Sequence, residues 1–443
     1  MNRKKLSLFA VLVFVMMAIP AQGIKVQAAS CKLDNAAWVG TFGYGVSCLD
    51  DSAWTSYVKG SSDLQSNQIA DVAVCADGST WVANTLGLLK VTADKTQAID
   101  TADITSMEAV ACDGKGGVWV AHYKGVSHFA DGKWDTTDSS KLGTGDNVSL
   151  VKDVAVAPEG KVYVVTSNSV AVYDGKAWTV YEKGKGFADN YFLEKIALDA
   201  KGNPFVAEDN GILTFDGKAW TEIKSDKLSL AQSVAVDSKG VVWVGTYSNG
   251  VSSFDGKSWT TYDRTNSKLS SNHVRVLAVD GQDRLWAGTE YGLDIFDGKD
   301  FTVYRMDNSD VLDNEIDALA VNGKGPAVPK VTSKKPGSLS GTIVNGKNPI
   351  ANSTIEVCVE FIGSSFSGDS PCGDNPFTKQ AKTDKDGKFT LTELPVGRYG
   401  LVVLGADGKW QRMTDSSGIN SKIEVTEGRD TDIGTIDLGK TTS

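Results

Sequence analysis

Few side chains in this sequence are suited to acid–base catalysis. The chain of 443 residues contains only three histidines, His122, His128 and His273. An imidazole can move a proton near neutral pH, but a catalytic pair has to converge on one cleft. The sequence contains no serine nucleophile motif, no glycine-rich phosphate loop and no Cys/His metal cluster. We therefore predict no catalytic residue, no metal ligand and no cofactor.

Two short motifs invite a ligand-binding interpretation at first sight. Residues 384–387 read Asp-Lys-Asp-Gly, like the start of a calcium loop, but the later ligands and the terminal glutamate are missing. The tripeptide Asp-Gly-Lys recurs at the same place in five similar strings, at residues 131–133, 174–176, 216–218, 255–257 and 297–299. Because glycine adopts positive φ angles without strain, both motifs are better explained as tight turns between strands.

The elements that position these motifs form a repeating unit. Its reference copy, Val234–Tyr262, contains four strand-like segments separated by turns. The aromatic residue of the second segment recurs at intervals of 38, 44, 42, 38 and 43 residues, at Trp81, Trp119, Tyr163, Phe205, Trp243 and Trp286. A period of about 40 residues with four short strands per unit is typical of a β-propeller blade.

Incomplete units at the two ends predict how the ring closes. Residues 38–41 (WVGT) and 54–57 (WTSY) match the second and fourth strands of a unit that lacks its first strand. Residues 316–321 (IDALAV) match a first strand alone, after which the pattern stops. We predict that Leu319–Val321 pairs with the strand that carries Trp38, which removes two exposed sheet edges. The predicted fold is all-β, with a seven-bladed propeller over residues 36–325.

The tryptophans follow the same repeat. Ten of the 11 tryptophans occupy only two positions of the unit, one in the second strand and one in the fourth. A fixed position in every unit is expected for a side chain that packs between blades, whereas an aromatic binding platform has no reason to repeat. We therefore assign these tryptophans to the core.

The face opposite the Asp-Gly-Lys turns is the predicted binding face. The loops between the second and third strands lie there, and they differ from unit to unit. Aromatic, carboxylate and amide groups around a concave axis suit a glycan, a peptide or a protein ligand. The candidate ligand-binding residues are Phe42, Tyr44, His122, Tyr123, Glu208, Tyr247, Asn249, Glu290 and Tyr291. The alternative is a solvated rim whose tyrosines pack on their neighbours.

Three strings carry a resemblance to a known repeat. They are LQSNQIADVAVCADGSTWVAN from Leu64, LSSNHVRVLAVDGQDRLWAGT from Leu269 and LDNEIDALAV from Leu312. This pattern resembles the two-component regulator propeller repeat over about residues 36–325. In that family such repeats often form exported sensor regions of hybrid histidine kinases. The chain departs from that arrangement because it has neither a kinase nor a membrane span, so the resemblance does not imply phosphorelay.

A second resemblance offers an enzymatic alternative. Seven-bladed streptogramin lyases use histidines of the binding face together with a glutamate, and the loops of His122 and His273 could both reach that face. Their predicted blades, the second and the sixth, lie nearly opposite each other, so a shared site would need the two rings to converge across the axis. A propeller lyase or hydrolase, or a purely structural envelope or adhesion protein, is therefore the alternative to a binding protein.

A second domain is predicted after the propeller. Residues 326–337 mix proline, lysine and serine and are expected to be a semi-rigid linker. Residues 338–440 alternate strand-like segments with glycine turns, which is typical of a β-sandwich. The pattern of Gly341–Val357 and Thr383–Val403 resembles the carboxypeptidase regulatory-like (prealbumin-like) domain. That resemblance implies a non-catalytic appendage that acts as a spacer or an adhesion module.

The N-terminus has the features of an export signal. A basic stretch precedes the apolar run Leu6–Ile19, and small residues follow, so we interpret residues 1–28 as a signal peptide. No second long apolar run follows, so we expect no transmembrane span and a location outside the cell or at its surface. Cys31 leaves two outcomes open, a lipid anchor or a disulfide.

Charge and cysteine content narrow the class of protein further. A formal net charge of −10 argues against nucleic acid as a partner, because phosphate binding needs clustered lysine and arginine. Six cysteines in an oxidising compartment favour disulfides, with Cys31 and Cys48, Cys75 and Cys112, and Cys358 and Cys372 as the candidates. The alternative is that one pair stays reduced. The sequence thus predicts an exported, non-enzymatic protein that binds a ligand or partner through one propeller face.

Overall fold

The computed structural model describes residues 31–51, 53–101, 104–143, 151–187, 192–359, 370–373, 375, 377–405, 408–413 and 422–439. The predicted signal peptide, residues 1–28, lies outside the described residues. Apart from one 3-10 helix, Ser139–Leu142, the regular structure of the described part consists of β-strands. The predicted all-β class is therefore confirmed.

Seven four-stranded antiparallel sheets make up residues 37–321, and we refer to each sheet as a blade. Six blades consist of four consecutive strands: β4–β7 (Ile69–Val74, Thr80–Asn84, Gly87–Val91, Thr96–Ile99), β8–β11 (Met107–Cys112, Val118–His122, Gly125–Ala130, Lys133–Asp138), β12–β15 (Val151–Val156, Val162–Thr166, Ser169–Tyr173, Trp178–Glu182), β16–β19 (Leu193–Leu198, Pro204–Glu208, Gly211–Phe215, Trp220–Lys224), β20–β23 (Ala231–Val236, Val242–Thr246, Val251–Phe254, Trp259–Tyr262) and β24–β27 (Val274–Val279, Leu285–Thr289, Leu293–Phe296, Phe301–Tyr304). Second strands such as β21 are buried along their whole length, because neighbouring blades cover both of their faces.

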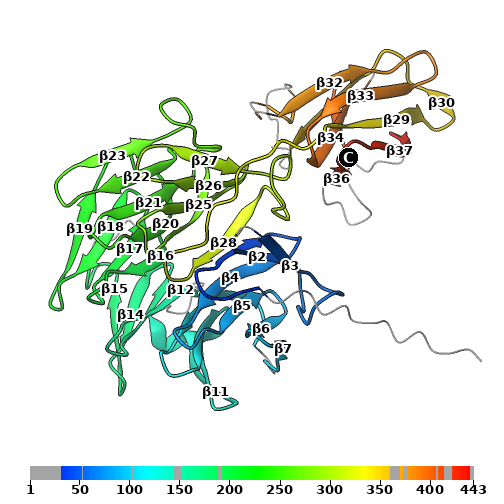
Figure 1. Ribbon diagram of the computed structural model, residues 1–443. Helices are drawn as coiled ribbons and strands as arrows, with labels where there is room; N and C mark the ends of the chain where they lie inside the picture. Colours follow the sequence, from blue (N-terminus) through cyan, green and yellow to red (C-terminus); the bar gives the residue numbers. More distant parts are fainter. Residues whose placement is uncertain are drawn as a thin grey trace, which may run out of the picture.

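The seventh blade is assembled from both ends of the propeller sequence. Its strands are β28, β1, β2 and β3 (Ile316–Val321, Ala37–Thr41, Val46–Asp50, Ala53–Tyr57). The register sets Val39 opposite Leu319, as the sequence predicts. Figure 1 shows the yellow β28 beside the blue strands from the start of the chain. First strands of successive blades contact one another around the ring, and β28 contacts β4, so the blades form a closed β-propeller.

Tryptophans of the second strands fill the spaces between blades. Trp81 and Trp286 are almost completely buried. The Trp81 ring lies 5.9 Å from the Phe129 ring of the next blade in an edge-to-face arrangement. Tryptophans of the fourth strands are half-buried instead, as Trp259 is where it packs on Phe254 at 4.9 Å between ring centroids. Both positions are structural, and the second-strand position is the more buried one except at Trp119, which is half-buried like the fourth-strand rings.

The Asp-Gly-Lys copies are turns between third and fourth strands. In four of them the aspartate carboxylate accepts hydrogen bonds from the amides two and three residues later, at Asp174, Asp216, Asp255 and Asp297. These amides lower the pKa of each carboxyl. The glycines that follow have φ angles from 91° to 94°. Asp384 caps its own turn through the amides of Asp386 and Lys388, so both motifs are turns.

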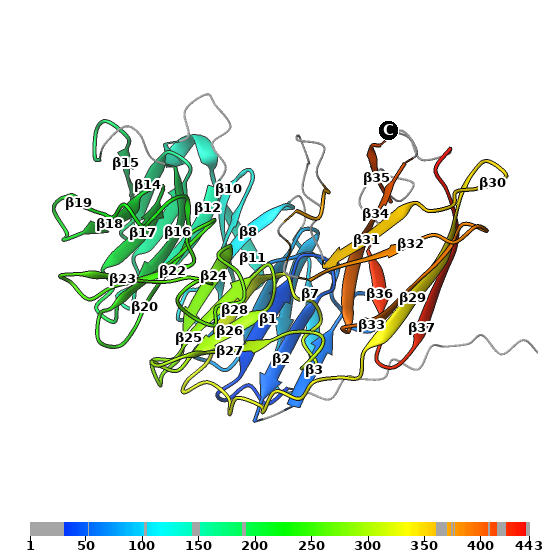
Figure 2. The same ribbon diagram turned by 90° about the horizontal axis from the view of Figure 1, so that it is seen from above.

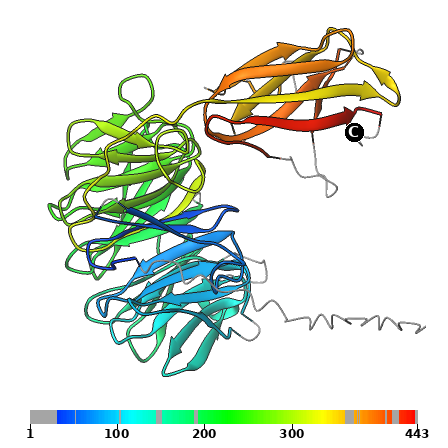
Figure 3. The ribbon, with the colours of Figure 1, turned by 45° about the vertical axis from the view of Figure 1, so that its right-hand side comes forward.

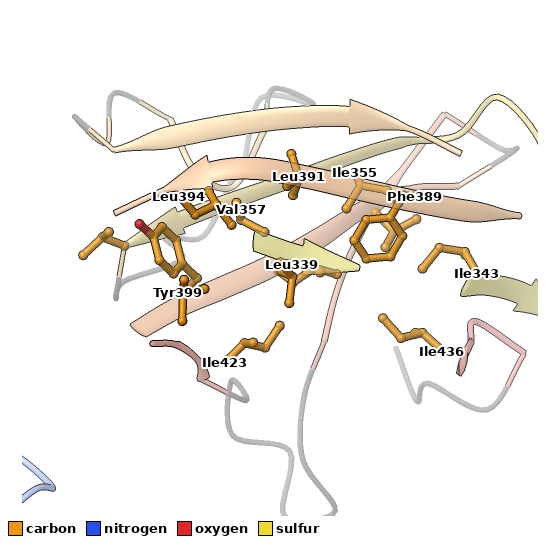
Figure 4. Packing of buried hydrophobic residues seen from close by; sticks show 14 of the residues in the cluster. Leu339, Ile343, Ile355, Val357, Phe389, Leu391, Leu394, Tyr399, Ile423 and Ile436 are labelled. Carbon is orange, nitrogen blue, oxygen red and sulfur yellow. The ribbon is translucent and has the colours of Figure 1, made fainter. Parts of the chain in front are cut away.

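Two further sheets form the C-terminal unit, which we define as described residues 337–439. One sheet has the order β30-β29-β33 with β37 parallel beside β29, and the other has the order β32-β31-β34-β35 with β36 also on β34. Strands β29 to β37 span Gly337–Asn345, Asn348–Pro349, Thr354–Val359, Thr378–Lys382, Lys388–Leu394, Gly397–Leu404, Trp410–Arg412, Ile423–Val425 and Asp430–Asp437. Figure 4 shows their shared core, in which Leu339 and Phe389 of one sheet meet Ile355 and Tyr399 of the other.

The segment between the propeller and the C-terminal unit is fastened to the propeller. The hydroxyl of Tyr304 donates a hydrogen bond to the carbonyl of Pro329 at 2.7 Å. The amide of Lys334 donates to the carbonyl of Asp307, also at 2.7 Å. Figure 3 shows this segment in yellow as it runs from the propeller to the C-terminal unit. The predicted linker is therefore a strap with its own contacts along the propeller.

Three disulfides join the cysteines in the pairs that the sequence suggests. Cys31 pairs with Cys48, Cys75 with Cys112, and Cys358 with Cys372, which leaves no free cysteine among the described residues. Because the sulfur of Cys31 is bonded to another sulfur, it is not available for a lipid, and the anchor considered for this residue is set aside. In the part of the chain that the structure describes, no helix has the length and apolar character needed to cross a bilayer.

Candidate functional site

Exposed hydrophobic side chains gather at one end of the propeller. We call this end the top face; it consists of the loops between second and third strands and the loops that lead into each first strand. Seven large hydrophobic side chains are exposed in the described residues, and all but Val331 lie on these loops, at Phe42, Leu86, Tyr123, Phe192, Leu230 and Tyr247. Single exposed hydrophobic residues are common, but their restriction to one face makes that face the candidate interaction surface.

A β-bulge at the start of every first strand directs a side chain to the top face, and six of these seven side chains are polar. The register between first and second strands shifts at the same point in all seven blades, at Ala70, Glu108, Lys152, Glu194, Gln232, Arg275 and Asp317. Bulges redirect side chains and are common beside functional sites. Sequence reasoning missed this set, although its signal was present: in six of the seven first strands a polar residue stands at the second position of a segment that is otherwise largely apolar.

Arg275 links two carboxylates near the bulges. Its guanidinium nitrogens lie 2.7 Å from a carboxylate oxygen of Glu315 and 2.7 Å from one of Asp317. Burial raises the pKa of Asp317 to about 6, although the charge of Arg275 opposes this rise. The second oxygen of Asp317 is buried without a hydrogen-bond partner among the described residues. Two half-buried acids therefore share one guanidinium at this point of the ring.

A second charged cluster joins two other blades. Lys195 lies 3.8 Å from Asp153, and Lys152 pairs with Glu194 at 2.9 Å. Burial raises the pKa of Asp71 and of Asp153, while the charge of Lys195 lowers both. These contacts run from blade to blade, so the first strands are held together by ion pairs as well as by apolar packing.

His273 connects the bulge residues to an exposed ring. Its Nε2 lies 2.9 Å from Oε1 of Gln232, and its Nδ1 lies 3.2 Å from Oε2 of Glu290. The imidazole centre is 4.4 Å from the centre of the exposed Tyr247 ring. Burial would raise the pKa of Glu290, but the hydrogen bond to His273 and the charges of His273 and Arg275 lower it. The predicted residues Tyr247 and Glu290 thus meet around His273.

His122 and Glu208 occupy a structural position of the repeat. In all seven blades the last residue of the second strand accepts a hydrogen bond from a backbone amide two or three residues later, at Thr41, Asn84, His122, Thr166, Glu208, Thr246 and Thr289. The side chains of His122 and Glu208 are completely buried. Burial, with the charge of Lys124, lowers the pKa of His122 to about 4. Both residues cap loops, so we remove them from the predicted ligand contacts.

Glu208 predicts a pH dependence of stability. Burial raises its pKa from 4.5 to about 7, and Glu222 and Asp209 add to the rise. The folded state therefore favours the protonated acid, and its contribution to stability is lost as pH rises from about 4.5 to 7. We expect Glu208→Gln to be more stable than wild type by about 2–3 kcal/mol at pH 8 and to show no gain near pH 4. Urea unfolding at both pH values measures this difference.

The control for this experiment is Glu159→Gln, which removes an exposed carboxylate. We expect it to change stability by less than about 0.5 kcal/mol at either pH, as for most surface substitutions. An equal gain for Glu208→Gln at pH 4 and pH 8 would show that the effect does not come from titration.

The C-terminal unit covers one sector of the top face. The guanidinium carbon of Arg398 lies 3.4 Å from the centre of the Tyr44 ring. Tyr291 is 9% exposed and packs in the hydrophobic core of the C-terminal unit, and its hydroxyl lies 3.3 Å from Nδ2 of Asn375. Tyr44 and Tyr291 therefore join two parts of the chain and are not open to a ligand. Packing of these tyrosines on their neighbours is the alternative that the sequence had left open.

The remaining predicted residues stay accessible. Phe42, Tyr123 and Tyr247 are exposed, and Asn249 and Glu290 are half-buried. Asn249 donates a hydrogen bond to the carbonyl of Lys227 at 3.0 Å, which ties its loop to the loop before it. Sequence reasoning missed three exposed residues of the top face, Leu86, Phe192 and Leu230.

Two cavities lie between blades away from the top face, with volumes of about 240 and about 660 Å³. The smaller is lined by Tyr163, Tyr181 and Phe215 together with Asp174 and Asp216. The last two carboxylates already accept hydrogen bonds from turn amides. No group of three or more His, Cys, Asp or Glu side chains in the described ranges is arranged to hold a metal ion. The top face is therefore the candidate site.

Comparisons with known proteins give one short family match and several distant structural similarities. Residues 268–291 match the family described as two component regulator propeller; this segment includes His273 and Glu290. The sequence matches none of the curated proteins.

Several solved structures are similar to parts of the chain. The extracellular domain of the hybrid two component system BT4673 from B. thetaiotaomicron is 18% identical, with 62% of this chain and 38% of that chain covered and a TM-score of 0.49. Virginiamycin B lyase from Staphylococcus aureus is 13% identical, with 51% and 80% covered and a TM-score of 0.44. PorZ, a surface component of the type-IX secretion system of Porphyromonas gingivalis, is 13% identical, with 84% and 62% covered and a TM-score of 0.48.

The chain thus spans less than two thirds of the length of the BT4673 domain and less than two thirds of the length of PorZ. The closed ring of four-stranded sheets and the matched repeat together identify the chain as a β-propeller protein that carries a two component regulator propeller repeat.

Proposed function

We propose that this protein is an exported, non-enzymatic protein that binds a ligand or a protein partner through the top face of its propeller. One observation carries the proposal: the exposed large hydrophobic side chains of the propeller gather on the top-face loops. They surround a ring of polar bulge residues, and Tyr247 beside His273 and Glu290 offers a stacking surface next to hydrogen-bonding groups. Such a combination suits a glycan, a peptide or a protein segment.

The proposal includes a domain organisation and a compartment. We propose seven blades over residues 36–325, a linker over residues 326–337 and a prealbumin-like sandwich over residues 338–440. Two sheets around one core support the sandwich. Three disulfides favour an oxidising compartment, which supports export by the signal sequence of residues 1–28 and a location outside the cell or at its surface.

A top-face lyase is the second candidate, because His273 lies within hydrogen-bond reach of Glu290 at the top face. Binding is favoured over catalysis because the second histidine that a lyase would use, His122, is completely buried and caps a loop. Incubation with lactones and polyuronates tests this alternative. Turnover by wild type that disappears in His273→Ala would replace the binding proposal with the enzymatic one.

The binding proposal predicts a thermal shift that depends on Tyr247. We expect at least one member of a glycan and peptide library to raise the melting temperature of the mature protein. Tyr247→Ala should weaken the binding of that compound about tenfold or more. An aromatic anchor often contributes roughly 1.4 kcal/mol or more to the binding free energy. Tyr247→Phe should retain most of the affinity, since the ring supplies the contact.

Lys176→Ala, in an Asp-Gly-Lys turn, provides a control outside the top face. Neither this change nor Tyr247→Ala should alter the unfolding free energy of the unliganded protein by more than about 0.5 kcal/mol, because both side chains are exposed. If the whole library leaves the melting temperature unchanged, or if Lys176→Ala weakens binding as much as Tyr247→Ala, the top face is not the binding surface.

A further inference from the structure

Arg398 is the central contact between the C-terminal unit and the propeller. It lies in β34 of the C-terminal unit and is only 8% exposed. Its guanidinium reaches the top face of the propeller, where Nη1 donates to the carbonyl of Leu312 at 2.5 Å and lies 3.3 Å from Oδ2 of Asp313. The Tyr44 ring stacks on the same guanidinium at 3.4 Å. A buried charge needs such partners, and here the propeller supplies most of them.

Other contacts surround Arg398 and set the orientation of the C-terminal unit. The guanidinium of Arg305 lies over the Phe377 ring, 4.7 Å from its centre. The Tyr291 ring of the propeller packs inside the core of the C-terminal unit. The strap of residues 326–334 holds the same two parts together. Figure 2 shows the C-terminal unit, yellow to red, beside the blue strands of the blade that closes the ring.

The C-terminal unit also reaches the polar bulge residues of the top face. Lys422 lies 3.4 Å from Oε2 of Glu315. The other oxygen of Glu315 lies 2.7 Å from Arg275, which in turn contacts Asp317. An unbroken chain of ion pairs therefore runs from the C-terminal unit into the bulge residues of the propeller.

The exposed hydrophobic residues of the top face lie outside the sector that the C-terminal unit covers. In the two covered blades, Tyr44 and Tyr291 pack against the C-terminal unit. Phe42 marks the border, because it is 53% exposed in the same loop as Tyr44. The other exposed residues of the top face belong to the blades that remain open, at Leu86, Tyr123, Phe192, Leu230 and Tyr247. The C-terminal unit therefore borders the exposed surface without filling it.

We propose that the top-face site is composite, with the C-terminal unit as its fixed wall and Arg398 as the residue that positions this wall. The C-terminal unit is then a part of the binding site, and not the spacer or adhesion module that its sequence resemblance implies. The wall itself follows from the contacts of Arg398, whereas its effect on binding rests on the proposed function. Arg398 acts by holding Tyr44 and Asp313 and does not itself contact a ligand.

A single labelled cysteine reports the position of the wall in the full-length protein. All described cysteines are in disulfides, so Phe42→Cys can carry an environment-sensitive fluorophore alone. We expect Arg398→Gln to shift the emission of this label toward that of a solvated dye and to increase the radius of gyration in X-ray scattering. The same label at Phe192→Cys, in a loop of an open blade, should not respond. Arg398→Lys should give an intermediate shift, because it keeps the charge but loses the planar stacking on Tyr44.

Matched variants distinguish a displacement of the C-terminal unit from a general loss of structure. Arg429→Gln removes an exposed arginine of the same unit and should leave both readouts at wild-type values. If Arg398→Gln does not fold, Tyr44→Ala removes the stacking partner from the propeller side and should produce the same emission shift. Unchanged emission and scattering in a folded Arg398→Gln or Tyr44→Ala protein would show that Arg398 does not position the C-terminal unit. This conclusion would hold whether or not any compound binds the top face.

A second arm tests the effect of the wall on binding. The library compound that gives the largest thermal shift with wild type serves as the probe. We expect Arg398→Gln to weaken the affinity for this probe about tenfold or more, while Arg429→Gln leaves the affinity unchanged. A displaced wall with undiminished probe affinity would show that the site is not composite. Absence of any probe would count against the proposed function, while the fluorescence result would still decide the position of the wall.

Discussion

Deletion of all residues up to Tyr57 is expected to abolish the cooperative, monomeric unfolding of the propeller. The deletion removes β1, β2 and β3 and leaves β28 with no partner strand within its blade. The exposed edges of β28 and of the open ring would then pair with other chains, because an unprotected strand edge is a template for association. It also removes Trp38, which is completely buried in the core of this blade. Light scattering and calorimetry of the purified protein measure the outcome.

Deletion from Gly337 onward is the control for this experiment. It removes the C-terminal unit but leaves every strand of the seven blades in place. We expect this protein to stay monomeric and to unfold in one transition, with a lower melting temperature because Tyr44 and Tyr291 lose their cover. A soluble, monomeric N-terminal deletion with one sharp transition would show that the ring does not depend on closure by β1.

Replacement of Trp286 by alanine is expected to cost about 3–5 kcal/mol of unfolding free energy. The indole is completely buried between blades, and its Nε1 donates a hydrogen bond to Oδ2 of Asp280 at 2.9 Å. Loss of the ring leaves a cavity that rigid neighbouring sheets cannot fill. Equilibrium unfolding in urea measures the change in free energy.

Trp259→Ala is the matched comparison, because Trp259 occupies the half-buried position of the repeat. We expect a cost of no more than about half that of Trp286→Ala, in proportion to the smaller apolar area removed from the core. Equal costs for the two substitutions would contradict the distinction between the two tryptophan positions.

Periodicity explains how much of the fold could be predicted. Four short strands every 40 residues or so leave few arrangements that bury all of the repeated tryptophans, and a blade is one of them. The incomplete units at residues 38–57 and 316–321 then predict their own pairing, which the register of Val39 with Leu319 bears out. Turns such as Asp255-Gly256 were equally predictable, because only glycine readily adopts the φ of 91° found at Gly256.

The candidate site was less predictable because it depends on contacts between distant segments. A loop position indicates which face a residue belongs to, but not whether another part of the chain covers it. Tyr44 and Tyr247 illustrate this limit, since both are tyrosines in equivalent loops. The first lies under Arg398, which is 354 positions further along the sequence, whereas the second is half exposed beside His273.

The buried residues His122 and Glu208 show a different limit. Their chemistry suggests recognition, yet they stand where four other blades have threonine, and they make the hydrogen bond that threonine makes there. Comparison of the last residue of the second strand across all units would have exposed this role from the sequence. The residue types alone suggest recognition, whereas the repeat position indicates a structural role.

The all-β class, the repeated unit, the turns and the pairing that closes the ring can be predicted from the sequence alone, because each depends on local periodicity and on residue types at fixed positions. Which top-face residues are open depends on tertiary contacts. That outcome depends on how the C-terminal unit packs against the propeller through Arg398, Lys422 and Tyr291. Such packing joins surfaces whose shapes and charges match in space, and no local pattern in the chain encodes that match.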